Sequence, residues 1–123
     1  MFLLCAVLLE KFKDKAAVVT RAAAEALDMM SLYSFTLPDV AEDVAAALAH
    51  RNPKVKESTG TWLANCTKRE TKANVLKLLP GVIPAAVKCT DEGAPAIRDA
   101  AFSFLVQAAL KVRWAGTALY GNS

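Results

Sequence analysis

Apolar residues recur along the chain at spacings of three and four positions, which is the periodicity of a helix with one buried face. The stretch from Val19 to Met30 shows the pattern clearly, because its apolar side chains form one stripe while Arg21 and Glu25 lie outside it. Prolines and clusters of polar residues separate the apolar stretches from one another. The pattern predicts six helices, at residues 2–12, 16–31, 38–49, 53–67, 71–89 and 95–112.

Several of these helices begin with residues that favour a helix N-terminus. The segment Thr36-Leu-Pro-Asp places a proline and an acid in the first turn, and Asn52 can cap the helix that Pro53 opens. By contrast, Pro80 and Pro84 lie inside the fifth predicted helix, where proline removes a backbone donor. These two prolines predict a kink or a break there.

The same event occurs three times along the chain: a polar turn, a small residue or proline, a β-branched residue and then an apolar helix. Two sets of positions correspond and are separated by 36 and then 42 residues, which averages 39: Val19, Val55 and Ile97, and Leu27, Leu63 and Leu105. This spacing is close to the roughly 40–47 residue period of HEAT and armadillo repeats. We therefore expect an all-α fold, an armadillo-like α-solenoid of about three HEAT-type helical hairpins at 1–112, followed by a divergent tail at 113–123.

Composition and charge narrow the functional classes. Hydrophobic residues make up 54% of the chain and charged residues 22%, which is typical of a folded domain. The net charge of +3 is too small to require nucleic acid, and we expect no nucleic-acid partner. The charge suits an acidic partner if the cations gather on one face. No uncharged stretch reaches the roughly 18 to 20 residues of a membrane span, so we expect no membrane partner.

The sequence contains no pattern that would support catalysis or metal binding. Cys5, Cys66 and Cys89 are odd in number and far apart, which argues against a disulfide framework or a zinc site and favours reduced, buried thiols. His50 is the only histidine, and no cysteine or carboxylate lies at ligand spacing from it, so we interpret it as a surface turn residue. We expect a protein that is not an enzyme and that uses no cofactor and no metal.

Basic residues cluster at the three repeated turns: Lys11, Lys13 and Lys15 at the first, Arg51, Lys54 and Lys56 at the second, and Arg98 at the third. Stacked repeats bring such turns to one edge, where cations would attract an acidic protein surface. For Arg98 the sequence leaves two interpretations open, because an arginine beside an aspartate at a helix start can also hold neighbouring repeats together. Trp62 lies beside Leu63, and we expect it to be packed between helices.

Three segments at these turns resemble the TOG (tumour-overexpressed-gene) domain of microtubule polymerases, a HEAT-repeat array. They are Leu9-Glu-Lys-Phe-Lys-Asp-Lys, then His50-Arg-Asn-Pro-Lys-Val-Lys-Glu-Ser-Thr with Trp62-Leu-Ala, and Ala94-Pro-Ala-Ile-Arg-Asp-Ala-Ala-Phe. The resemblance runs from about Leu8 to Val112 and corresponds to the third, fourth and fifth repeats, in the second half of such a domain. It implies that this chain is part of a longer multi-repeat protein.

The resemblance also implies a function. A TOG domain binds αβ-tubulin and contributes to microtubule dynamics, so the implied partner is tubulin at the microtubule plus end, and the implied location is the cytoplasm and cytoskeleton, at microtubules, the spindle or the centrosome. By the same resemblance, the tubulin-binding turns would use Lys13, Lys15, Arg51, Asn52, Lys54 and Arg98. The alternative is a general HEAT-repeat scaffold for a transport, phosphatase or chromatin assembly, which would bind through a helix face and not through the turns.

Overall fold

A computed structural model describes the backbone of residues 2–33 and 35–121, together with the side chains of 5–33 and 35–113. Within these residues the regular structure is entirely helical, with six α-helices and two short 3₁₀ helices. The elements in chain order are α1 Phe2–Glu10, η1 Lys11–Lys13, α2 Ala17–Tyr33, η2 Leu37–Val40, α3 Ala41–Leu48, α4 Pro53–Arg69, α5 Lys72–Thr90 and α6 Pro95–Gly121. The expected all-α fold is confirmed.

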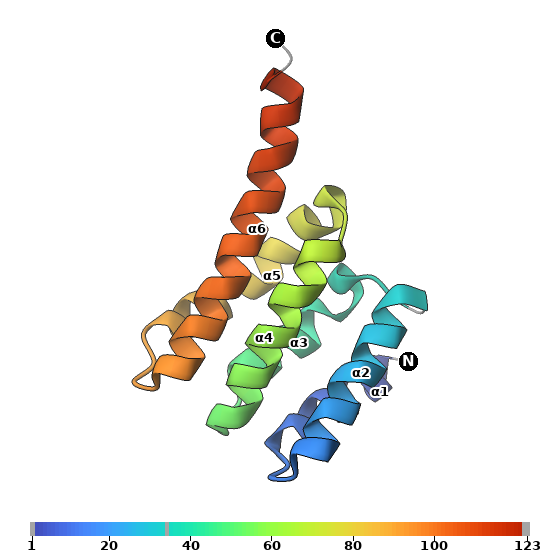
Figure 1. Cartoon of the computed structure of the whole chain (residues 1–123), viewed down its shortest axis with the longest axis vertical. Helices are drawn as coiled ribbons and strands as arrows, with labels where there is room; N and C mark the ends of the chain where they lie inside the picture. Colours follow the sequence, from blue (N-terminus) through green and yellow to red (C-terminus); the bar gives the residue numbers. More distant parts are fainter. Residues whose placement is uncertain (1, 34, 122–123) are drawn as a thin grey trace.

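The helices form three antiparallel hairpins stacked in two layers. Helices α2, α4 and α6 lie side by side in one layer, and α1, α3 and α5 lie behind them (Figure 1). Each hairpin pairs one helix of the rear layer with the next helix of the front layer, because a short turn joins them. This is the arrangement expected of about three HEAT-type helical hairpins.

The local signals for helix starts act as predicted. The Thr36 backbone N–H donates to Asp39 Oδ2 at 2.9 Å, which forms one half of a capping box at the start of η2. Asn52 Oδ1 accepts a hydrogen bond from the Lys54 backbone N–H at 2.9 Å, so Asn52 caps α4 as expected. The predicted helix at 38–49 is divided in the structure into the 3₁₀ helix η2 and the α-helix α3.

Helix α5 runs from Lys72 to Thr90, close to the predicted 71–89, with Pro80 and Pro84 inside it. Of the two predicted effects of these prolines, a kink or a break, the break does not occur. Val75 and Leu78 before Pro80 are buried in the core, as are Val82 and Ala86 after it. This packing holds the helix together despite the lost backbone donors. Helix α6 extends past the predicted end at residue 112 to Gly121. The predicted tail at 113–123 stays a prediction, and the side chains of 114–123 lie outside the described residues.

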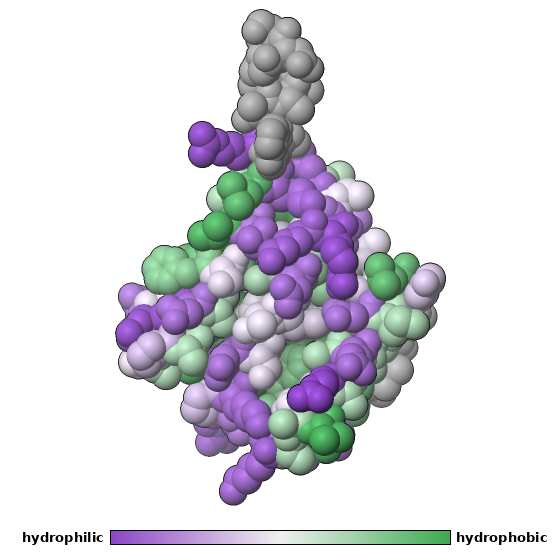
Figure 2. Space-filling model, viewed as in Figure 1, coloured by the Kyte–Doolittle hydropathy of each residue, from purple (hydrophilic) through white to green (hydrophobic). Residues whose placement is uncertain are grey.

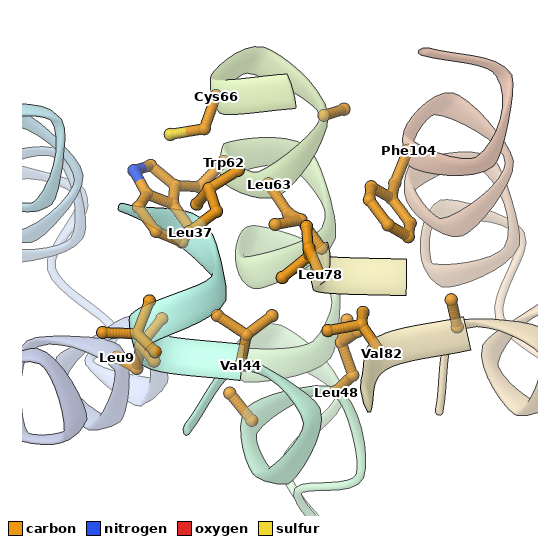
Figure 3. Close-up of a cluster of buried hydrophobic side chains, with 14 of the residues drawn as sticks. Leu9, Leu37, Val44, Leu48, Trp62, Leu63, Cys66, Leu78, Val82 and Phe104 are labelled. Atoms are coloured by element: carbon orange, nitrogen blue, oxygen red, sulfur yellow. The ribbon is translucent and has the colours of Figure 1, made fainter. Parts of the chain in front are cut away.

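The core receives side chains from every α-helix. Figure 3 shows part of it, where Val44, Leu63 and Leu78 lie close together. Val55, Leu27 and Leu63 are completely buried, as their repeated positions predict. Trp62 is only 4% exposed, which confirms that it is packed between helices. Ile97, the third β-branched residue of the repeat, is also buried, whereas Val19 and Leu105 are only partly buried. No described helix combines the length and the apolar character that crossing a membrane requires.

The front layer is unevenly spaced. Helices α4 and α6 pack so closely that a Cβ added to Gly60 would lie only 3.0 Å from the Cβ of Ala100. Between α2 and α4 the structure instead has a groove of about 400 Å³, whose walls include Thr20 and Ala24 on α2 and Thr61 on α4. Trp62 also contributes to this groove. The two neighbouring contacts in one layer therefore differ: one is tight and the other is open.

Candidate functional site

The turns within the three hairpins, at residues 14–16, 49–52 and 91–94, lie at the same end of the helices, and we call them together the turn edge. Figure 1 shows them along its lower side, where α2, α4 and α6 begin. The first turn follows η1, the second follows α3 and the third follows α5. The stacking of the hairpins thus brings together basic residues that are far apart in the sequence.

The first turn is held by its own acidic residues. Asp14 Oδ1 accepts a hydrogen bond from the Ala16 backbone N–H at 2.8 Å, which fixes the entry into α2. Lys13 Nζ lies 3.3 Å from Glu10 Oε1, and its side chain is 57% exposed, so this ion pair is largely solvated. Lys15 is exposed, and within the described residues its side chain forms no hydrogen bond or ion pair.

The second turn is organised around His50. The Asn52 backbone N–H donates to His50 Nδ1 at 2.9 Å, and His50 Nε2 lies 2.8 Å from Glu10 Oε2 in the preceding repeat. Because Nδ1 accepts, the neutral ring carries its proton on Nε2, where it can donate to the carboxylate. His50 is therefore a structural residue of this turn. It is partly buried, whereas the sequence predicted a surface turn residue. Arg51, next to it, is exposed and has no such partner in the described part of the chain.

Three contacts join neighbouring turns. Lys54 Nζ donates to the backbone oxygen of Asp14 at 2.6 Å, and the His50–Glu10 contact also connects the second turn to the first repeat. The ion pair between Lys56 and Glu92 connects the second repeat to the third turn. The turn edge is therefore a continuous hydrogen-bonded surface, which keeps its exposed groups at fixed relative positions.

The third turn is different in charge. Arg98 donates from one guanidinium nitrogen to the backbone oxygens of Glu92 and Gly93, at 2.9 and 3.0 Å. This geometry supports the structural interpretation of Arg98, within its own turn rather than between repeats. The turn and its helix start also carry the acids Asp91, Glu92 and Asp99. The positive charge of the edge is consequently concentrated on the first two turns.

The six predicted binding residues thus fall into two groups. Lys15 and Arg51 are exposed and unpaired within the described residues, and Lys13 is exposed with one solvated ion pair. The other three, Asn52, Lys54 and Arg98, are partly buried and use their polar groups to hold the turns. The structure brings all six to one edge. Their role in binding stays a prediction.

Sequence reasoning did not identify Glu10 as a member of this edge. Although partial desolvation acts in the opposite direction, hydrogen bonds and charge from Lys13 and His50 lower the pKa of the Glu10 carboxyl. Glu10 precedes His50 by 40 residues, so the only available signal was the repeat spacing. That spacing indicates which repeats are adjacent, but not which side chains meet.

The described residues contain no group of three or more histidine, cysteine or acidic side chains that could hold a metal ion. The three cysteines are free and buried, as predicted. Burial raises the pKa of the Cys5 and Cys66 thiols to about 12 and also raises the pKa of Cys89. Thiols with such pKa values are poor nucleophiles and poor metal ligands at neutral pH.

Curated proteins from plants and an insect are similar to this chain in sequence. The chain is 40% identical over 107 residues to "Protein MOR1" of Oryza sativa subsp. japonica and to "Protein MOR1" of Arabidopsis thaliana, over 86% of the chain and 5% of each relative. It is 36% identical over 94 residues to "Protein mini spindles" of Drosophila melanogaster, over 75% of the chain and 4% of that relative. The chain therefore spans about one twentieth of the length of these relatives. No protein-family model matches it, and no solved structure does.

Proposed function

From the homology of this chain to a small segment of the TOG-domain proteins MOR1 and mini spindles, we propose that it is a non-catalytic module that binds αβ-tubulin. In this proposal the turn edge is the binding surface, and the module contributes to microtubule dynamics in the cytoplasm, at microtubules, the spindle or the centrosome. The edge presents cations, which would attract an acidic surface of the partner.

The observation that carries the proposal is the distribution of free charge on the turn edge. Lys15 and Arg51 are exposed on adjacent turns, and neither is paired within the described residues. Lys54 connects the same two turns through the Asp14 backbone oxygen. A rigid edge with two unpaired cations can meet acidic side chains without first breaking internal ion pairs, which lowers the cost of binding.

The partly buried polar residues of the edge have a second task in this proposal. Asn52, Lys54 and Arg98 position the turns, so their substitution would weaken binding by disturbing the shape of the edge. Lys15 and Arg51 would contact tubulin directly. Substitution of Lys15 and Arg51 is therefore the cleaner test, because their side chains form no hydrogen bond within the described residues.

The test compares two double variants that remove the same charge. Lys15→Ala with Arg51→Ala removes the free cations of the edge, and Lys68→Ala with Lys77→Ala removes two exposed lysines from other parts of α4 and α5. We expect the edge variant to bind purified αβ-tubulin about tenfold more weakly, and the control to bind like the unsubstituted chain. Binding of the unsubstituted chain should also weaken as salt is added. Equal binding by all three proteins would refute the proposed edge.

The alternative function, a general HEAT-repeat scaffold, is favoured by one observation: the groove between α2 and α4. Thr61 and Asn65 are exposed on its α4 wall, away from the turn edge. Arginine at both positions would fill the groove and leave the turns unchanged. The groove variant is compared with the Lys15→Ala, Arg51→Ala variant for binding to the same partner protein. If only the groove variant loses this binding, the result would favour the scaffold over tubulin binding by the edge.

A further inference from the structure

The first two turns of the edge are closed by the same kind of hydrogen bond. In the first turn, Asp14 Oδ1 accepts from the Ala16 backbone N–H at 2.8 Å. In the second, His50 Nδ1 accepts from the Asn52 backbone N–H at 2.9 Å. The 36-residue shift between the first two repeats relates Asp14 to His50. The two side chains therefore have the same role at equivalent positions, each as the acceptor for the backbone N–H two residues later.

The two acceptors respond differently to acid. Histidine side chains titrate between about pH 5 and pH 8, whereas carboxyl side chains lose their charge only in more acidic solution. A neutral imidazole has one nitrogen that accepts, but in the protonated ring both nitrogens are donors. Protonation of His50 would therefore point two N–H groups at each other across the 2.9 Å that separates Nδ1 from the Asn52 nitrogen. An imidazolium cannot close the second turn, while a carboxylate continues to close the first.

The contact with Glu10 keeps the ring from turning away. His50 Nε2 lies 2.8 Å from Glu10 Oε2, in the preceding repeat. A half-turn of the ring would move Nδ1 away from Asn52, but it would also take Nε2 away from Glu10. A charged ring binds a carboxylate more strongly than a neutral one does, so this contact tightens on protonation. The ring consequently stays on Glu10, and the backbone of the turn is the part that has to move.

Protons from solvent can reach the ring, because the His50 side chain is 27% exposed. Figure 2 shows hydrophilic, purple residues at the lower end of α4, where the second turn lies. Charges of both signs surround the ring: Glu10 favours the imidazolium, and nearby cations oppose it. These charged groups are Glu10 and its partner Lys13 from the first repeat, Asp14 and Lys54 at the contact between the turns, and Arg51 beside the ring in sequence.

We propose that the second turn is a proton-sensitive switch: when His50 takes up a proton in mildly acidic solution, the hydrogen bond to its Nδ1 is lost and residues 49–52 open, while the first turn stays closed. Arg51 lies between the two residues that this hydrogen bond joins, so opening changes the position of an exposed cation of the turn edge. The inference does not rest on tubulin binding, because the switch is a property of the chain alone.

Nuclear magnetic resonance of the complete chain tests the switch directly. His50 is the only histidine, so a protein made without a histidine tag gives one pair of imidazole nitrogen signals, which report the proton on each nitrogen. Exchange of the Asn52 and Ala16 amides with water is measured from about pH 8 to about pH 5.5. Each rate is divided by that of an unstructured peptide at the same pH. We expect protection of the Asn52 amide to fall about tenfold as the ring takes up its proton, and protection of Ala16 to stay constant.

The matched variant is His50→Asn, which copies the chemistry of the first turn. An asparagine oxygen can accept from the N–H two residues later, as Asp14 does, and it takes up no proton in this pH range. We expect the Asn52 amide in this variant to stay protected at both ends of the range. His50→Ala removes the acceptor, so the same amide should be unprotected throughout. Far-ultraviolet circular dichroism would verify that both variants are helical.

Three results would overturn the inference. Unchanged protection of Asn52 while the ring is protonated would show that the imidazole does not hold the turn closed. An equal loss of protection in His50→Asn would assign the effect to another titrating group. A ring that takes up no proton down to about pH 5.5 would show that the second turn is not a switch in mildly acidic solution. The first two results need no measurement of tubulin binding, so they leave the proposed function to its own test.

Discussion

Lys54 extends from the second repeat to the first and donates a hydrogen bond from its Nζ to the backbone oxygen of Asp14, at 2.6 Å. The two residues are 40 positions apart in the sequence, and the contact joins the first two turns of the edge. A residue predicted as a binding cation therefore has a structural task. This distinction determines how substitutions on the edge should be interpreted.

Removing the Lys54 ammonium should destabilise the fold. Lys54→Met keeps most of the apolar stem and leaves the Asp14 oxygen without this donor, so we expect the free energy of unfolding to fall by about 1 kcal/mol. Lys15→Met removes the same charge where no described contact is lost, and it should change stability by less than about 0.5 kcal/mol. Urea denaturation of both variants checks this. Equal stability of the two variants would show that the Lys54 contact contributes nothing.

Close packing of α4 on α6 predicts a large effect at Gly60. The Cβ of a substituted residue would lie 3.0 Å from Ala100 Cβ and 3.3 Å from the Ala100 backbone carbon, and backbone cannot move aside easily. We expect Gly60→Val to lower the free energy of unfolding by about 1 to 3 kcal/mol. Gly93→Ala is the control, since nothing lies within 4 Å of its added Cβ. The check is thermal unfolding of both variants. Equal melting temperatures would contradict the close packing of α4 on α6.

Burial of the three thiols predicts slow chemical modification. The pKa of Cys5 and Cys66 is about 12, so almost no thiolate exists at neutral pH, and burial also blocks access. We expect a disulfide reagent such as dithionitrobenzoate to react with the folded chain at the rate of its opening or unfolding, and with all three thiols at once in denaturant. A rapid reaction of even one thiol in the folded chain would contradict the described burial.

The ion pairs of Glu10 predict acid sensitivity. Since its pKa is lowered from the ordinary 4.5 in the folded chain, the unfolded chain binds protons more readily there. The stabilisation is present above about pH 4.5 and is lost as pH falls through the lower, folded-state pKa. Glu10→Gln should therefore be less stable than the unsubstituted chain at neutral pH, and the difference should shrink on acidification. If the stability difference between the two proteins stayed constant across this range, the lowered pKa of the Glu10 carboxyl would not be its source.

Much of the fold could be predicted from the sequence because its signals are local. Helix period, the Asn52 cap and the three repeated turns each depend on residues close together in the chain, and each is found in the structure. The predicted break at Pro80 and Pro84, which does not occur, has the opposite origin. Proline weakens a helix locally, but core contacts on both sides of Pro80 preserve α5, and a local rule does not include them.

The candidate site was predictable only in part, for a related physical reason. The repeat spacing correctly placed the basic turns together, since stacking follows from the spacing. Which cations stay free depends on side-chain contacts between repeats, such as Lys54 with Asp14 and Lys56 with Glu92. These contacts depend on the exact register of one hairpin on the next. No pattern in the sequence distinguishes Lys54, which is used internally, from Arg51, which is exposed beside it.

Amide hydrogen exchange of the chain with and without αβ-tubulin locates the surface that tubulin covers. If the first two turns of the edge contact tubulin, exchange slows at residues 14–16 and 49–52, while exchange along the α2–α4 groove is unchanged. Slower exchange confined to the groove, or no change anywhere under conditions where tubulin is bound, would contradict binding by these turns.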